Sequence, residues 1–179
     1  MSKIIILIGM LCMPVMSVAN DEIIKTSISI AIVDTQKLMS ESKAAKSIQR
    51  QGIALRKKYQ NEIESIEKDL KKSEAALVKA SKGKSKDDFL KKQKTFQESV
   101  LESKKTVAEL NQKMDKAVGN ALKKLKDEII DVVEDIADDK EYDMVLSNTN
   151  VLVVSDKMDI TDRVMKALNS EVSSISVRD

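Results

Sequence analysis

Two long stripes of apolar and small residues constrain the fold of this chain more than any other feature. The first has spacings of three and four and passes through Ile48, Gly52, Leu55, Tyr59, Ile63, Ile66, Leu70, Ser73, Leu77 and Ala80. The second runs with similar spacings from Phe89 to Ile136. This pattern is typical of one buried face of a helix. The sequence therefore predicts two long helices.

The two stripes also predict how the helices pair. In an antiparallel pair, the residue numbers of facing positions have a nearly constant sum. Ser73 with Phe96 gives 169, and Leu70 with Val100 gives 170. This register centres the turn close to residue 85, inside the stretch 81–88 that interrupts both stripes. Since the outward positions are largely charged or polar, the stripe resembles a coiled-coil seam.

Short β-type segments flank the hairpin. In residues 27–33 large apolar residues alternate with small ones at a period of two, so that Ile28, Ile30 and Ile32 would share one face of a strand. Residues 142–147 and 151–155 are further β-type runs, and the turn-prone Asn148-Thr149-Asn150 between them predicts a hairpin.

The expected fold class is therefore mainly α with a small β body that carries a long antiparallel coiled-coil helical hairpin. Residues 44–123 would form the hairpin arm. Residues 20–43 would supply the first strand and a short helix of the body. Residues 124–179 would supply the rest of the body: a helix end, the two later strands and a C-terminal helix over 161–169.

The first 19 residues have the pattern of a cleaved signal peptide. Lys3 precedes the apolar run Ile4 to Met13, and small residues follow up to an expected cleavage between Ala19 and Asn20. The apolar run is too short to span a bilayer. Cleavage would remove the one cysteine, Cys12, so the mature chain would contain no disulfide.

The charge is unevenly distributed. Residues 44–123 contain 20 basic and 11 acidic side chains, whereas residues 124–179 contain 7 basic and 14 acidic ones. Lysines crowd around the expected turn at Lys79, Lys82, Lys84, Lys86, Lys91, Lys92 and Lys94. Such a cluster is either a solvated helix end or a surface that attracts anionic partners.

The composition argues against an enzyme and against a cofactor. The chain contains no histidine, and its four glycines form no phosphate-binding loop. The acidic side chains between Asp127 and Asp139 are spread along a helix, so a solvated face is favoured over a metal site. We therefore expect no catalytic residue, no metal and no cofactor.

Each predicted helix carries a glycine near the base of the arm. In the register above, Gly52 faces Val118, which is next to Gly119. A glycine weakens a helix by about 1 kcal/mol relative to alanine. The pair indicates either close helix packing at this level or a hinge that allows the arms to splay.

The order of these segments resembles the Skp/OmpH family over essentially the whole mature chain. The resemblance is carried by the first strand, Ile30-Ala31-Ile32-Val33-Asp34, by the returning segments 142–146 and 151–154, and above all by the closing stretch Asp159-Ile160-Thr161-Asp162-Arg163-Val164. The hairpin itself is generic and could be matched by many coiled coils.

The resemblance implies a periplasmic chaperone that works without ATP and holds unfolded outer-membrane proteins between the arms of a homotrimer. It places Ile28, Ile30, Ile32, Val145 and Val153 in the trimer body. The lysines around the turn would contact clients, and contact with anionic lipid is left open. The near-neutral net charge departs from the basic character associated with the family, although the arm itself is basic.

Two other functions fit parts of the sequence. A structural coiled-coil tether would also use a long hairpin, but it would not suppress aggregation of an unfolded protein. A nucleic-acid-binding protein would also use lysines, but the nearby Phe89 and Phe96 belong to the apolar stripe, which leaves no other aromatic beside the lysines for base stacking, and an export signal precedes them. We therefore expect no nucleic-acid partner.

Overall fold

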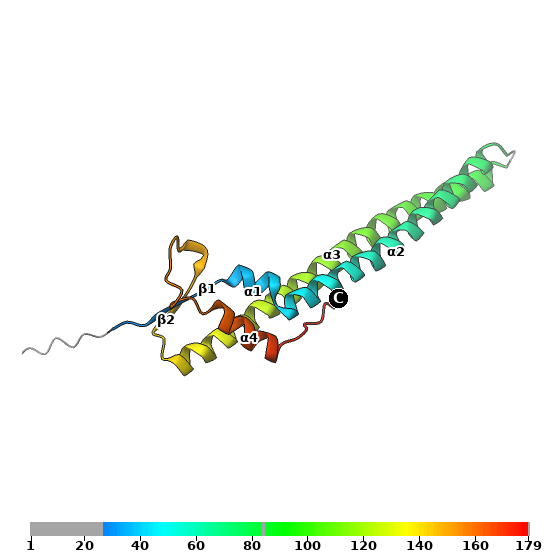
Figure 1. Cartoon of the computed structure of the whole chain (residues 1–179). Coiled ribbons are helices and arrows are strands. Elements are labelled where there is room, and N and C mark those ends of the chain that lie inside the picture. Colours follow the sequence, from blue (N-terminus) through cyan, green and yellow to red (C-terminus); the bar gives the residue numbers. More distant parts are fainter. Residues whose placement is uncertain (1–26, 84, 179) are drawn as a thin grey trace, which may run out of the picture.

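The computed structural model describes residues 27–83 and 85–178, and the predicted signal peptide lies outside them. These residues form a long antiparallel helical hairpin attached to a small body with a two-stranded sheet (Figure 1). The predicted fold class, mainly α with a small β-containing body, is confirmed.

The body begins with strand β1, Ile30–Val33, and the short helix α1, Thr35–Glu41. Asp34 separates them and caps α1, because its carboxylate accepts a hydrogen bond from the Lys37 N–H at 2.8 Å. Ser42 ends α1 and begins the next helix, and its buried hydroxyl accepts from the Ala45 N–H. The capping side chains of Asp34 and Ser42 thus determine where the chain leaves the sheet and where the arm helix begins.

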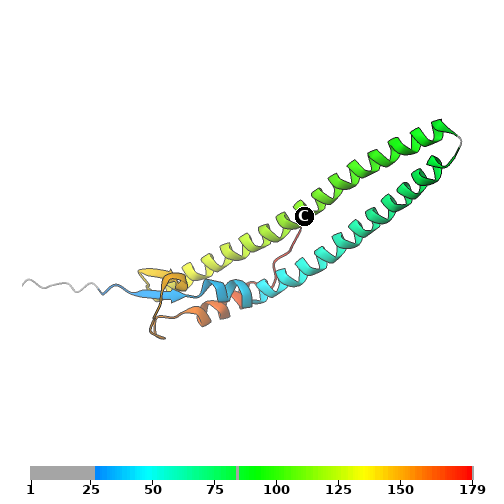
Figure 2. The ribbon, with the colours of Figure 1, turned by 90° about the horizontal axis from the view of Figure 1, so that it is seen from above.

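The arm consists of α2, Lys43–Ser81, and the first part of α3, Lys86–Lys140. At a rise of about 1.5 Å per residue, α2 alone extends for roughly 60 Å. Figure 2 shows the two helices running side by side away from the body, joined by a short connection at the far end. Ser85 caps α3 through the Asp88 N–H, with Asp87 and Asp88 in its first turn.

The predicted stripes are the inward faces of the two helices. Every described stripe position is buried or partly buried, and the flanking positions are mostly exposed. The register is also as predicted, since a side chain added at Gly52 would meet Val118 at 3.6 Å. Along the outer arm the stripe is only half-buried, because two helices without a third element cannot cover it fully.

After α3 the chain reverses at Glu141, which adopts a left-handed conformation with φ of 54°. Strand β2, Met144–Ser147, then pairs in parallel with β1, and Ile32 lies beside Leu146. The arm is the crossover that a parallel pair requires. A 3-10 turn, Asn148–Asn150, and helix α4, Thr161–Glu171, follow.

The predicted hairpin of residues 142–147 with 151–155 is wrong. Residues 151–155 form no strand, and β2 pairs with β1 instead. The second edge of β1 is occupied by a later segment: the Ile32 N–H donates to the Met158 carbonyl at 2.8 Å, and the Ile160 N–H donates to the Ile32 carbonyl at 2.9 Å. Local β-propensity could not show that both edges of β1 are already filled.

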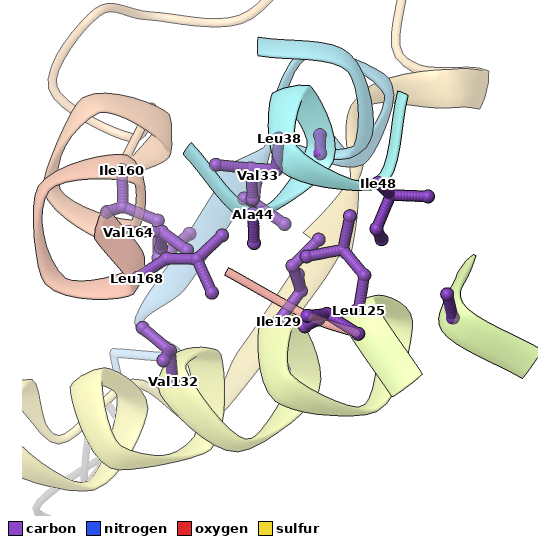
Figure 3. Packing of buried hydrophobic residues seen from close by; sticks show 14 residues of the cluster. Val33, Leu38, Ala44, Ile48, Leu125, Ile129, Val132, Ile160, Val164 and Leu168 are labelled. Atoms are coloured by element: carbon purple, nitrogen blue, oxygen red, sulfur yellow. The ribbon is translucent and has the colours of Figure 1, made fainter. Parts of the chain in front are cut away.

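The hydrophobic core lies where α1, the base of α2, the body end of α3 and α4 meet one face of β1 (Figure 3). Leu38, Leu125, Val164 and Leu168 are completely buried there. Since α3 contributes residues to this core and also runs the full length of the arm, the arm is built into the body.

Candidate functional site

The lysines predicted at the tip lie on the surface of the arm. Lys79 lies in the last turn of α2 and Lys82 directly follows that helix. The first turns of α3 carry Lys86, Lys91, Lys92 and Lys94, and all six side chains are exposed. Lys84 lies outside the described residues. Lys94 forms an exposed ion pair with Glu98 at 3.8 Å, a contact that contributes little in water. The tip therefore presents charge to solvent.

Apolar side chains are exposed on the same arm. Val78 and Leu90 lie among the tip lysines, Leu101 is 69% exposed further along α3, and Ile53 and Leu122 are exposed near the base. These residues were not among the predicted site residues. The sequence could have predicted their exposure, because each is an apolar residue that falls outside the stripe on its helix.

Shallow grooves follow the seam between the two helices. One of about 270 Å³ is lined by Leu70, Phe96 and Val100 together with charged side chains of α2. Another of about 410 Å³ lies at the base and is lined by Met39, Ile48, Gly52, Ile53, Arg56, Met114, Val118 and Leu122, among others. The arm therefore combines partly covered apolar surface with basic side chains along its length.

The two glycines lie at one level near the base of the arm, as predicted. At Gly52 an added side-chain carbon would be in ordinary van der Waals contact with Val118, and at Gly119 it would meet nothing within 4 Å. Close packing therefore requires glycine at neither position, and the hinge stays a prediction.

One face of the sheet is turned away from the core of the chain. The register places Ile30 beside Met144 and Ile32 beside Leu146 on this face. Ile32 is buried within the chain and Ile30 is partly buried, so only part of the face is exposed. Met144, Leu146 and the preceding Ile28 are exposed, and Leu152 and Val153 are 101% and 90% exposed on the loop after β2. Val145 lies beside Ala31 on the opposite face and packs on the chain's own core.

The stretch Asp159-Ile160-Thr161 joins the sheet to α4. The Thr161 hydroxyl accepts a hydrogen bond from the Asp34 N–H at 2.8 Å, and the Asp159 carboxylate accepts from the Thr161 N–H at 2.8 Å. Side-chain and backbone hydrogen bonds from Thr161 hold the pKa of the Asp159 carboxyl below its usual value. Ile160 and Val164 enter the core, so this stretch has a structural explanation.

Within the described ranges, no group of three or more Asp or Glu side chains is arranged to hold a metal ion. No helix in the same ranges is long and apolar enough to cross a membrane.

Comparison with known proteins identifies the family. The model of the family described as outer membrane protein (OmpH-like) matches residues 29–168. The chain belongs to the OmpH-like family. A Skp-like protein of Pseudomonas aeruginosa PAO1 is 29% identical over 143 residues, which cover 78% of this chain and 83% of that protein.

The fold is also known from a crystal structure. An OmpH-like protein of Caulobacter crescentus CB15, proposed to be an outer membrane chaperone, matches with a TM-score of 0.78. The match covers 86% of this chain and 91% of that one at 16% identity, so it shows a shared fold. The family resemblance seen in the sequence is thus confirmed.

Proposed function

We propose that this OmpH-like chain is an ATP-independent holdase that binds unfolded outer-membrane proteins and prevents their aggregation. The observation that carries the proposal is the arm itself. Its apolar seam is only half-buried, and Val78, Leu90 and Leu101 are exposed among basic side chains. An unfolded polypeptide can make many weak apolar and charged contacts with such a surface, none of which requires a defined sequence.

The proposal includes assembly into a homotrimer through the free face of the sheet. Two short strands are too few to be stable as an isolated sheet. The apolar side chains of Ile28, Met144, Leu146, Leu152 and Val153 offer a surface that further copies could cover. Three arms around one cavity would raise the local concentration of weak contacts.

The periplasm is the proposed compartment. Support comes from the signal-peptide pattern of residues 1–19, with expected cleavage between Ala19 and Asn20. Non-catalytic holding is consistent with a sequence that lacks histidine.

The tip lysines are proposed to attract acidic clients and anionic lipid headgroups. Neighbouring lysines act together within a screening length of about 8 Å at physiological salt, chiefly by raising encounter rates. Replacing Lys82, Lys91 and Lys92 with glutamine should slow capture at low salt and have little effect at high salt. Equal slowing at both salt concentrations would contradict an electrostatic role.

The decisive experiment is suppression of aggregation. A denatured β-barrel membrane protein is diluted, without nucleotide, into buffer that contains the chain at stoichiometric ratios, and light scattering is recorded. A holdase keeps the scattering low. The triple variant Val78→Ser, Leu90→Ser and Leu101→Ser should lose most of this protection, because it removes exposed apolar surface from the arm.

A matched control is Ile130→Ser, which removes an exposed apolar side chain from the body end of α3. It should protect as the parent chain does. Failure of the parent chain to suppress aggregation would overturn the proposal and favour the structural tether.

A further inference from the structure

Residues 172–178 cross from the end of α4 to the base of α2. In Figure 1 and Figure 2 this segment leaves α4 and ends beside the lower part of the arm. Its central residue, Ile175, is only 4% exposed and belongs to the core, while Val172 and Val177 pack against that core. The segment is thus bound to the rest of the chain by apolar side chains in an extended stretch.

The side-chain amide of Gln51 on α2 binds the backbone of this segment at two points. Its Nε2 group donates to the Ile175 carbonyl at 2.7 Å and to the Ser47 hydroxyl at 3.0 Å. Its Oε1 atom accepts from the Val177 N–H at 3.0 Å. The amide therefore pairs with two backbone groups of the segment, as a neighbouring strand residue would.

A second link lies two turns nearer the start of α2. The side-chain oxygen of Asn169 accepts from the Lys43 N–H at 2.6 Å, which satisfies a donor in the first turn of α2. Both links come from residues after Leu168, where the match to the family model ends. The family pattern therefore does not account for them.

Gln51 lies where α2 leaves the body, so its contacts can affect the direction of the arm. On α2, Ala44, Ala45, Ser47 and Ile48 are buried in or near the body, and the next buried side chain along the helix is Tyr59. Gln51 thus lies just beyond the last residue of α2 that is buried in the body. On α3 the core residues Leu125, Ile129 and Val132 anchor the helix in the same way as Ala44, Ala45 and Ile48 anchor the start of α2.

We propose that residues 172–178 are a strap that fixes the angle at which α2 leaves the body and so limits how far the arm can open. The proposal rests on the proposed function in one respect, namely that arm opening accommodates the client. Releasing the strap would leave Ile48 as the last residue of α2 that is buried in the body. Gly52, the next residue after Gln51, would then become the natural point of bending.

Two variants release the strap: Gln51→Ala, and a chain ended after Glu171. The chain starting at Asn20 has no cysteine, so spin labels can be placed at Lys79→Cys on the arm and Lys166→Cys on α4. Labelled chains are diluted into unlabelled ones, and the distance distribution is measured. Both variants should broaden the distribution, and amide hydrogen exchange over residues 49–58 should become roughly tenfold faster.

The matched control is Gln49→Ala, which removes an exposed glutamine two residues earlier on α2. It should leave the distance distribution and the exchange rates as in the parent chain. Unchanged values in Gln51→Ala would overturn the strap even if the shortened chain failed to fold. If the parent chain protects from aggregation but the variants have unchanged label distances, only the strap is contradicted. If the variants have broadened distances but the parent chain does not protect, only the holdase function is contradicted.

Discussion

Thr161 shows how single hydrogen bonds join the two ends of this chain. Its side chain is buried, and its hydroxyl accepts from the N–H of Asp34, 127 residues earlier. Asp34 in turn caps α1. The sheet, α1 and α4 therefore meet at one hydroxyl group.

Replacing Thr161 with valine should destabilise the body by about 1–3 kcal/mol, because the Asp34 N–H would be left without its acceptor in a partly buried site. Chemical denaturation of the two chains measures the difference. Thr161→Ser keeps the hydroxyl and should retain most of the stability. A valine variant as stable as the serine variant would show that the hydrogen bond contributes nothing.

Asp159 should make stability depend on acid. Hydrogen bonds from Thr161 hold the pKa of Asp159 below its usual value, so its carboxylate stabilises the fold above the unfolded pKa. That contribution is lost as the pH falls through the folded pKa. Asp159→Asn should therefore reduce the free energy of unfolding at pH 7. Below about pH 4 this variant should lose less of that free energy than the parent chain does.

Denaturation measured between pH 2 and pH 7 tests this dependence. Asp156→Asn is a suitable control, because Asp156 is an exposed aspartate on the same loop. Parallel acid curves for the parent and Asp159→Asn would contradict the assignment.

At the scale of the helices, replacing the glycines near the base of the arm should affect the stability of the helices and the motion of the arm in different ways. Neither is required by packing, so the double variant Gly52→Ala, Gly119→Ala should be more stable by up to about 2 kcal/mol. If the glycines form a hinge, the same variant should narrow the distribution of distances between arm tips. Paired spin labels at the tip measure that breadth.

A control for this variant is Ser65→Ala, which improves helix propensity at an exposed position further along α2. It should change stability slightly and leave the breadth unaltered. A double variant that is more stable but equally broad would refute the hinge and leave the glycines without a mechanical role.

The helices could be predicted from sequence far better than the sheet. A repeat sustained from Ile48 to Ala80 specifies a buried face and a register by itself, and the structure has both. Strand pairing depends on partners distant in sequence. Residues 151–155 have β-propensity but no free edge of β1 to pair with, because residues 158–160 occupy it. The strap was missed because a short segment with one or two apolar residues carries no periodic signal.

The candidate site was predicted only in part, because some of its features are visible in the local sequence and others depend on strand pairing. The lysines form a cluster that is visible as a run in the sequence, and the described ones are indeed exposed. Val145 was predicted in the trimer body, which stays a prediction. In the single chain it packs on the core, because register with β1 decides which side of a four-residue strand faces the core. Met144 and Leu146 occupy the outward positions.

At the scale of the whole molecule, the chain is a long basic arm on a small acidic body. Residues 44–123 have an excess of nine positive charges, and residues 124–179 an excess of seven negative ones. Copies joined through their bodies with arms parallel would bring like-charged arms together. Repulsion between arms would favour an open cavity, while contacts with a client would favour a closed one.

The proposed assembly would be held together at the exposed part of the sheet, around Met144 and Leu146. Leu146→Asp places a charge on this face, beside Ile32, where a neighbouring copy would have to bury it. The variant should remain helical, because Leu146 is exposed in the single chain, but it should lose the trimeric mass. Native mass spectrometry and light scattering on the chain starting at Asn20 measure the outcome.

Leu101→Asp provides the control, since it adds the same charge at an exposed leucine on the arm. This variant should keep the parent mass, because repulsion along an exposed arm is screened by salt. Two results would count against assembly through the sheet: a monomeric parent chain, or an Leu146→Asp variant with unaltered mass. In the second case the side chains of Leu152 and Val153 would be the next surface to test, because they are the most exposed large apolar side chains on the loop after β2.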